Sequence, residues 1–277
     1  MTQLLFSGLV LAGSLLGGML GSLTGLGGGV VIVPMLALLF HVNLRYAIGA
    51  SLISVIATSS GSAAAYVREG FSNMRIGMFL EIATTVGAIC GAWLATRVPT
   101  AGISIVFGVI LLYSVYLSLR KHGSSLVAHD PWSDRLKMNG VYPTGPGEKR
   151  EYSVTHIPAG FATMFGAGTL SGLLGIGSGA VKVLAMDSIM RVPFKVSTTT
   201  SNFMIGVTAA ASAGIYLREG YIIPALAAPV LLGILPGSLL GAKLLVKSQS
   251  KSLRVVFAAV ILVLAIEMIY NGWAGRV

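Results

Sequence analysis

The sequence predicts an all-α, polytopic membrane protein made of two inverted repeats, each with a glycine-broken helical hairpin and three further transmembrane helices. Three observations lead to this class: the composition, the recurrence of long apolar segments, and an internal repeat. Hydrophobic residues make up 55% of the 277 residues and charged residues only 10%, whereas a soluble domain carries about 25% charged residues. So few charges cannot form a water-compatible surface, and the apolar segments of about 20 residues are therefore expected to cross a bilayer.

The net charge of +10 could indicate a nucleic-acid partner, but the sequence shows no soluble domain that would carry such a patch. Lys and Arg also gather in the cytoplasmic loops of membrane proteins, which is the stronger interpretation. The single cysteine, Cys90, lies in an apolar run and offers no disulfide framework. The first residues, MTQLLFSGLV, have no basic residue before the apolar run, so we expect them to be retained as a membrane segment rather than removed as a signal peptide.

An internal repeat divides the chain. YVREGF at 66–71 matches YLREGY at 216–221, an offset of 150 residues (216 less 66). The same offset superimposes Gly25, Gly27 and Gly29 on Gly175, Gly177 and Gly179, Ser51 on Ser201, Ser62 on Ser212, Gly87 on Gly237, and Gly91 on Gly241. One gapless offset predicts two copies of one unit, residues 1–120 and residues 157–277. Residues 121–156 between them are polar and rich in proline, which indicates an aqueous linker, with a regulatory binding segment as the alternative.

Each copy is expected to hold one long apolar stretch and three clear spans. The expected segments are 4–40, 46–67, 76–97 and 101–120 in the first copy, and 157–190, 196–217, 223–246 and 252–272 in the second. The stretch 4–40 is too long for one helix across a hydrocarbon core of about 30 Å. Because the glycine clusters GLGGG (25–29) and GIGSG (175–179) divide these stretches, we expect a helix, a break and a second helix in each copy.

The distribution of basic residues predicts the orientation. Suppose that each hairpin returns to the side of the membrane that it entered, or crosses the membrane twice. Fourteen Lys and Arg residues then lie on one side of the membrane and four on the other. Lys182 lies inside the second hairpin and completes the total of 19. The positive-inside rule then places the 121–156 loop in the cytoplasm and both termini outside a plasma (inner) membrane. Each copy crosses an odd number of times, so the two copies have opposite orientations. Inverted repeats with broken helices near the midplane are an architecture of secondary transporters.

A broken helix leaves backbone N–H and C=O groups that cannot stay unpaired in hydrocarbon. The helices that start near Gly29 and Gly179 would point their N-termini at an anion between them, because each N-terminus has free N–H donors and about half a positive charge. Close helix packing is the alternative use of such glycines, and a P-loop is excluded because neither motif is followed by Lys and Ser or Thr. The candidate substrate-binding residues at the breaks are Gly25, Gly27, Gly28, Gly29, Gly175, Gly177, Ser178 and Gly179.

Lys182 is the most informative side chain near the breaks. It lies three residues past Gly179 in an apolar run, and a cation in that setting is a functional hypothesis by default. It could contact the anion, pair with Asp187, or extend toward the membrane surface. The first copy has Ile32 at this position, so the site would be chemically asymmetric.

Hydroxyl and amide groups follow each break, in GAS (49–51) and STTTSN (197–202). Ser51, Ser201 and Asn202 are candidates for binding the oxygens of an anion, and capping of a helix is the alternative. Three carboxylates, Glu81, Asp187 and Glu267, are candidates for carrying a proton, although Glu81 and Glu267 could equally lie near an interface.

Other chemistry finds no support in the sequence. The four histidines fall in loops or at the ends of spans, and no spacing indicates a metal site or a cofactor. No Ser/His pair and no HExxH motif points to an intramembrane enzyme. We therefore expect no metal, no cofactor and no catalysis.

Four motifs carry a resemblance to a known family: GLGGGVVIVP, AIGASL, GIGSGAVKVL and KVSTTTSNFMIGVTAAASAGIYLREG. With them the chain resembles the sulfite exporter family TauE/SafE, also called the toluene sulfonate uptake permease family, over nearly its whole length apart from the linker. The resemblance implies an exporter of sulfur-containing anions such as sulfite, thiosulfate or organosulfonates, with alternating access and the glycine motifs and Lys182 at the site. The chain departs from the family pattern at Ser178, where a third glycine is usual, at Leu184, and in GAS where GTS is usual.

Two other functions stay open. A passive anion channel is one, and strict stoichiometric coupling to a proton gradient would argue against it. A non-transporting membrane scaffold or assembly factor is the other, and there Gly28, Gly179 and Lys182 would matter only for folding. The expected partners are a small anionic substrate and membrane lipid, with protons as a candidate coupling ion and a homodimer as a candidate assembly.

Overall fold

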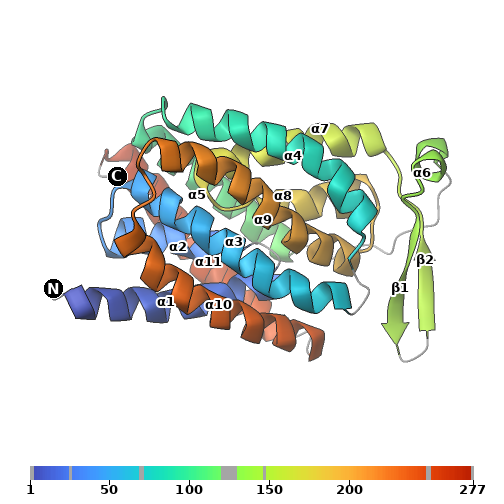
Figure 1. Ribbon diagram of the computed structural model, residues 1–277, viewed down its shortest axis with the longest axis horizontal. Helices are drawn as coiled ribbons and strands as arrows, with labels where there is room; N and C mark the ends of the chain where they lie inside the picture. Colours follow the sequence, from blue (N-terminus) through green and yellow to red (C-terminus); the bar gives the residue numbers. More distant parts are fainter. Residues whose placement is uncertain are drawn as a thin grey trace.

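The computed structural model describes residues 3–24, 27–68, 72–119, 130–145, 148–247 and 251–275. Long helices run side by side along one axis, and a small helix with a two-stranded hairpin lies at one end (Figure 1). The long helices are α1 (Gln3–Thr24), α3 (Leu44–Arg68), α4 (Met74–Ala95), α5 (Thr100–Leu119), α7 (Ile157–Leu174), α9 (Phe194–Arg218), α10 (Pro224–Lys247) and α11 (Lys251–Trp273). Two short helices, α2 (Gly29–Pro34) and α8 (Gly179–Leu184), run into the π-helical turns η1 (Met35–Leu39) and η2 (Ala185–Ile189).

The surface of the bundle suits lipid. Four segments of the described residues are long and apolar enough to span a membrane: Leu5–Ser22, Met74–Ala95, Ile157–Leu174 and Pro224–Gly241. Large apolar side chains are exposed on them, such as Ile82 and Trp93 on α4 and Leu232 on α10. Because an apolar surface of this extent marks contact with a membrane or a partner, and the segments are long enough to cross, the chain is a multi-pass membrane protein.

Helices α3 and α9 are rich in Ser and Thr and pack against each other inside the bundle. Several of their hydroxyls bond within their own helices: Thr58 Oγ1 donates to the Ser54 carbonyl oxygen at 2.8 Å, and Ser212 Oγ donates to that of Thr208 at 3.2 Å. Such bonds to the preceding turn allow polar residues to lie inside a membrane bundle. The two most polar long helices can therefore form its centre.

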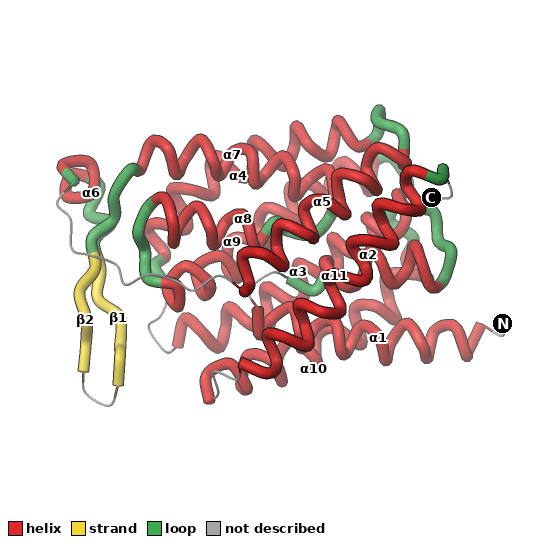
Figure 2. The backbone as a smooth tube through the Cα atoms, turned by 180° about the vertical axis from the view of Figure 1, so that it is seen from behind, coloured by secondary structure: helices red, strands yellow, loops and turns green. Residues whose placement is uncertain are grey.

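The same series of elements occurs twice along the chain. Helix α2 begins at Gly29 and α8 at Gly179, and α3 begins at Leu44 and α9 at Phe194, so both pairs keep the 150-residue offset. Figure 1 shows α1 starting at the end of the bundle that holds both termini, and α7 starting at the opposite end, beside the hairpin. Figure 2, seen from behind, shows the same arrangement of termini and strands.

Small residues bring helices of the two halves into backbone contact. Helix α4 packs against α7, and α1 packs against α10. A Cβ added at Gly91 of α4 would lie 1.9 Å from the Thr169 carbonyl oxygen, and one at Gly237 of α10 would lie 2.1 Å from that of Leu15. Glycines outside the two motifs thus serve close packing, as small residues commonly do between membrane helices.

The described part of the linker, residues 130–145 and 148–156, is folded rather than a plain loop. It contains helix α6 (Pro131–Arg135) and an antiparallel hairpin of β1 (Gly140–Gly145) and β2 (Glu148–Tyr152), so the chain is nearly, not wholly, all-α. Tyr152 is buried, and Asn73 Nδ2, at the start of α4, donates hydrogen bonds to Tyr152 Oη at 2.7 Å and to the Met138 carbonyl oxygen at 3.2 Å. Burial raises the pKa of Tyr152, against the smaller opposing effect of the Asn73 hydrogen bond. Polar composition indicated a loop here, but these contacts hold the linker against the bundle.

Candidate functional site

The first glycine cluster separates two helices. Helix α1 ends at Thr24 and α2 begins at Gly29. Gly27 has φ +82°, a backbone region that glycine enters without steric cost. Gly25 lies outside the described residues. Because Gly28 already has helical dihedrals, φ −65° and ψ −22°, the turn is concentrated just before it.

The second cluster makes a tighter break. Helix α7 ends at Leu174, and Gly175 and Gly177 follow with φ +67° and +74°. Ser178, at φ +49°, precedes α8. A non-glycine residue in the left-handed region costs about 1 kcal/mol, so Ser178 holds a conformation that the glycine usual at this position would adopt freely.

The two breaks contact each other inside the bundle. Ser51 Oγ of α3 donates a hydrogen bond to the Gly175 carbonyl oxygen at 2.7 Å. A Cβ added at Gly29 would lie 2.6 Å from Ser51 Oγ and 2.8 Å from the Gly175 carbonyl oxygen. A Cβ on Gly27 would lie 3.4 Å from the carbonyl oxygen of Ile176. Candidates from both halves therefore meet at one place.

Polar groups without partners lie around the second break. Asn202 of α9 is fully buried, and neither its Nδ2 nor its Oδ1 has a hydrogen-bond partner among the described groups. Ser178 Oγ is also buried and has no hydrogen-bond partner among the described groups. Beside them, Ser201 Oγ donates to the Gly179 carbonyl oxygen at 3.4 Å, and Ser59 Oγ donates to the carbonyl oxygen of Asn202 at 2.5 Å. Since native proteins leave few buried polar groups unpaired, this is a place where a polar ligand would be stabilised.

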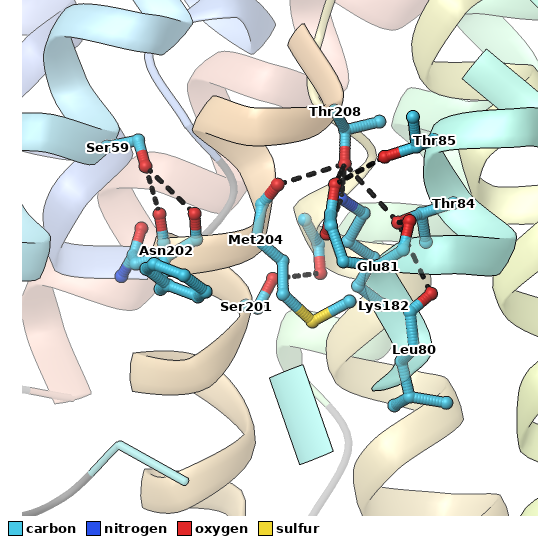
Figure 3. A network of polar contacts seen from close by, with 12 residues as sticks. Ser59, Leu80, Glu81, Thr84, Thr85, Lys182, Ser201, Asn202, Met204 and Thr208 are labelled. Carbon is cyan, nitrogen blue, oxygen red and sulfur yellow. Dashed lines mark hydrogen bonds and ion pairs between the residues drawn. The ribbon is translucent and has the colours of Figure 1, made fainter. Parts of the chain in front are cut away.

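Lys182 lies on the other side of α9 from Asn202, within a polar network (Figure 3). It is fully buried, and its Nζ donates to Thr208 Oγ1 at 2.5 Å and lies 4.0 Å from Glu81 Oε2. Thr208 Oγ1 lies 2.6 Å from Glu81 Oε1, which also accepts from Thr85 Oγ1 at 3.3 Å. The hydroxyl of Thr208 thus links the ammonium and the carboxylate.

The three candidate proton carriers lie in different surroundings. Glu81 of α4 is the ion-pair partner of Lys182. Asp187 lies half-buried in η2, and Glu267 is exposed on α11. The structure therefore brings Glu81 into the network, pairs Lys182 with it rather than with Asp187, and leaves Glu267 outside it.

Thr208, Thr84 and Thr85 belong to this network and were missed from the sequence. A signal was available for one of them, because the 150-residue offset relates Thr208 to Thr58. The sequence gave no such signal for Thr84 and Thr85 of α4, because isolated threonines are ordinary members of an apolar span. Their role depends on how α4 packs against α9.

Comparison with known proteins identifies the family of this chain. The sequence pattern of the family described as "Sulfite exporter TauE/SafE" matches residues 9–268. The chain belongs to the sulfite exporter TauE/SafE family. Among the relatives of this TauE/SafE protein is "Probable membrane transporter protein YunE" of Bacillus subtilis, 30% identical over 93% of this chain and 95% of the relative.

Two further relatives of this TauE/SafE protein also carry transporter names. "Probable membrane transporter protein YdhB" of Bacillus subtilis is 26% identical over 85% of this chain and 88% of its own length. "Probable membrane transporter protein MJ0441" of Methanocaldococcus jannaschii is 25% identical over 91% of each chain. No solved structure gives a significant match. Family and relatives together identify a membrane transporter, not an enzyme.

Proposed function

We propose that this TauE/SafE protein is a secondary transporter that exports sulfur-containing anions such as sulfite, thiosulfate or organosulfonates. In this proposal the anion binds between the two glycine breaks, and the two halves of the chain, residues 1–120 and 157–277, act as inverted repeats that expose it to each side in turn. Inverted repeats with broken helices at the midplane are typical of secondary transporters.

The observation that carries the proposal is the contact between the two breaks. The bond from Ser51 to the Gly175 carbonyl oxygen joins a helix of the first half to the break of the second. In the same break the hydroxyl of Ser178 is buried without a partner among the described groups, and so is the amide of Asn202, which follows Ser201, the donor to the Gly179 carbonyl oxygen. An oxyanion could accept hydrogen bonds from both, together with the backbone N–H groups that a helix start leaves free.

The arrangement of the ends supports the orientation. Both termini lie at one end of the bundle and the folded linker at the other (Figure 1). With the linker, which carries Arg135, Lys137 and Arg150, on the cytoplasmic side of the plasma membrane, both termini lie outside, as the positive-inside rule requires. Each half then crosses an odd number of times, which gives the halves opposite orientations.

Burial argues against the passive channel. A channel needs a continuous open path, whereas Lys182, Asn202 and Ser201 are each 0% exposed. This burial supports a carrier, in which access to the site alternates, over a permanently open pore.

The test is flux of radiolabelled sulfite into proteoliposomes, competed with thiosulfate, taurine, sulfoacetate and sulfate. The decisive variant is Asn202→Leu, because the related position of the first half is Leu52, so leucine suits a buried position of this helix. We expect saturable flux in the parent protein and at least tenfold less in the variant, with both proteins monodisperse. Absence of flux for every anion of the panel would point to the scaffold function instead.

A further inference from the structure

The cluster of Lys182, Thr208 and Glu81 raises a question that anion binding alone does not answer. A buried lysine is enough to attract an anion, but here its ammonium is already neutralised by a carboxylate 4.0 Å away. Both side chains are buried, Lys182 fully and Glu81 to 7% exposure. An anion that uses Lys182 must therefore compete with Glu81.

The first half shows that the fold does not require these charges. The offset of 150 relates Lys182 to Ile32, Glu81 to Leu231, Thr84 to Ile234, and Thr208 to Thr58. Ile32 and Ile234 are fully buried, so apolar side chains complete the equivalent place. Because replacing a buried ion pair with apolar groups is often neutral or stabilising, stability alone does not explain the charged pair of the second half.

The two oxygens of Glu81 have different surroundings. Oε1 lies within hydrogen-bond distance of the hydroxyls of Thr208, at 2.6 Å, and Thr85, at 3.3 Å. Oε2 is buried and has no hydrogen-bond partner among the described groups. This oxygen faces Lys182 Nζ at 4.0 Å, beyond hydrogen-bond distance. A buried carboxylate oxygen without a hydrogen bond is costly, and a proton bound there would remove the charge that makes it so.

We propose, building on the transport function above, that Glu81 carries the coupling proton and that it is protonated when the anion binds at the glycine breaks, where Lys182 supplies the balancing positive charge. The pair Lys182 and Glu81 is neutral when the site is empty. An anion would leave the interior negative, which is unfavourable in a medium of low polarity. Uptake of one proton by the carboxylate (COO⁻ + H⁺ → COOH) restores neutrality for a monoanion and leaves the Lys182 ammonium as its counter-charge.

The elements packed around Glu81 offer few other titratable groups that could carry the proton. Helix α7 has no titratable side chain between residues 157 and 174. On α9, Lys195 lies 13 residues before Thr208, and Tyr216 and Arg218 lie 8 and 10 residues after it, which is about 12 Å or more along the helix. Asp187 follows Lys182 by five residues and lies half-buried in η2. Among the described residues, Glu81 is the carboxylate that contacts Lys182.

The experiment measures anion and proton movement in the same proteoliposomes, with the membrane potential clamped at zero. The probes are thiosulfate and methanesulfonate, whose charges do not change near neutral pH. Any proton that crosses with them is therefore carried by a group of the protein and not by the anion. We expect one proton per anion for both probes. The accumulation ratio should then change about tenfold for each unit of imposed pH gradient.

The variants are Glu81→Gln and, as the matched control, Glu267→Gln, which removes an exposed carboxylate from an apolar helix. In Glu81→Gln the flux that remains should move no protons and should not respond to the pH gradient, whereas Glu267→Gln should keep the parent ratio. Proton movement that persists in Glu81→Gln, or parent flux without protons, overturns the inference and leaves the transport function standing. No flux of either probe in the parent protein overturns both.

Discussion

Ser51 and Gly175 lie 124 residues apart in the chain and are joined by a buried hydrogen bond of 2.7 Å, from the hydroxyl of α3 to the carbonyl oxygen that follows α7. This bond ties the break of one half to a helix of the other. A backbone carbonyl freed by a helix break inside a membrane must find a donor, and Ser51 supplies it. The bond therefore serves both the fold and the proposed site.

Ser51→Ala should reduce anion flux more than it reduces stability. The matched control is Ser104→Ala, because Ser104 Oγ also donates a buried hydrogen bond of 2.7 Å to a backbone carbonyl, that of Met268, between α5 and α11. Each variant should lower the free energy of unfolding by about 1 kcal/mol. Thermal unfolding in detergent and flux in proteoliposomes separate the two effects, and an equal flux loss in both variants would assign Ser51 to stability alone.

Gly91→Ala should destabilise the packing of α4 on α7. The added Cβ would lie 1.9 Å from the Thr169 carbonyl oxygen, so the helices must separate, at a cost of about 2 kcal/mol. Gly166→Ala on α7 is the control, since nothing lies within 4 Å of its Cβ. We expect a lower melting temperature for Gly91→Ala and no decrease for Gly166→Ala; a similar decrease in both would show that loss of glycine, not contact, is responsible.

The stability of the folded protein should depend on pH in the alkaline range, because Tyr152 of the linker is buried. Burial raises the pKa of Tyr152 above its ordinary value of 10.0, so the folded protein holds this proton more tightly than the unfolded chain does. This tighter proton binding stabilises the folded protein below about pH 10, and the stabilisation is lost as the pH rises through the pKa of Tyr152 in the folded protein. Below about pH 10, Tyr152→Phe should be less stable by about 1 kcal/mol, and this difference should shrink at higher pH because phenylalanine does not ionise.

Thermal unfolding of the parent and of Tyr152→Phe across this pH range is the measurement. The control is Tyr142→Phe, which removes a phenol from the other strand of the same hairpin. If Tyr142→Phe abolishes the same pH dependence, Tyr152 is not the group responsible.

Sequence patterns located the helices better than the contacts between them. A span was predicted at 76–97 and α4 occupies Met74–Ala95, and the predicted span 196–217 corresponds to α9 at Phe194–Arg218. Hydropathy and the repeat are sufficient for this, because a span is a property of consecutive residues.

The partner of Lys182 could not be predicted in the same way. Glu81 precedes Lys182 by about a hundred residues and reaches it only because α4 packs against α7 and α9. Asp187 was the nearer carboxylate in sequence, but nearness along a helix does not decide contact. The hairpin of the linker was missed for a related reason: proline, glycine and charge predict a loop locally, whereas the buried contacts of Tyr152 and Met138 depend on a helix far away in the sequence.

The charged pair of the second half should be replaceable by the apolar pair of the first without loss of fold. Lys182→Ile combined with Glu81→Leu copies Ile32 and Leu231, and such replacements are neutral or stabilising by about 1–4 kcal/mol. Lys182→Ile alone leaves Glu81 buried without its partner and should be less stable than the double variant by about 3 kcal/mol. Thermal unfolding in detergent compares them, and both should lack proton-coupled flux. A double variant as unstable as the single one would mean that the ion pair holds α4 against α8, and the charges would then need no functional explanation.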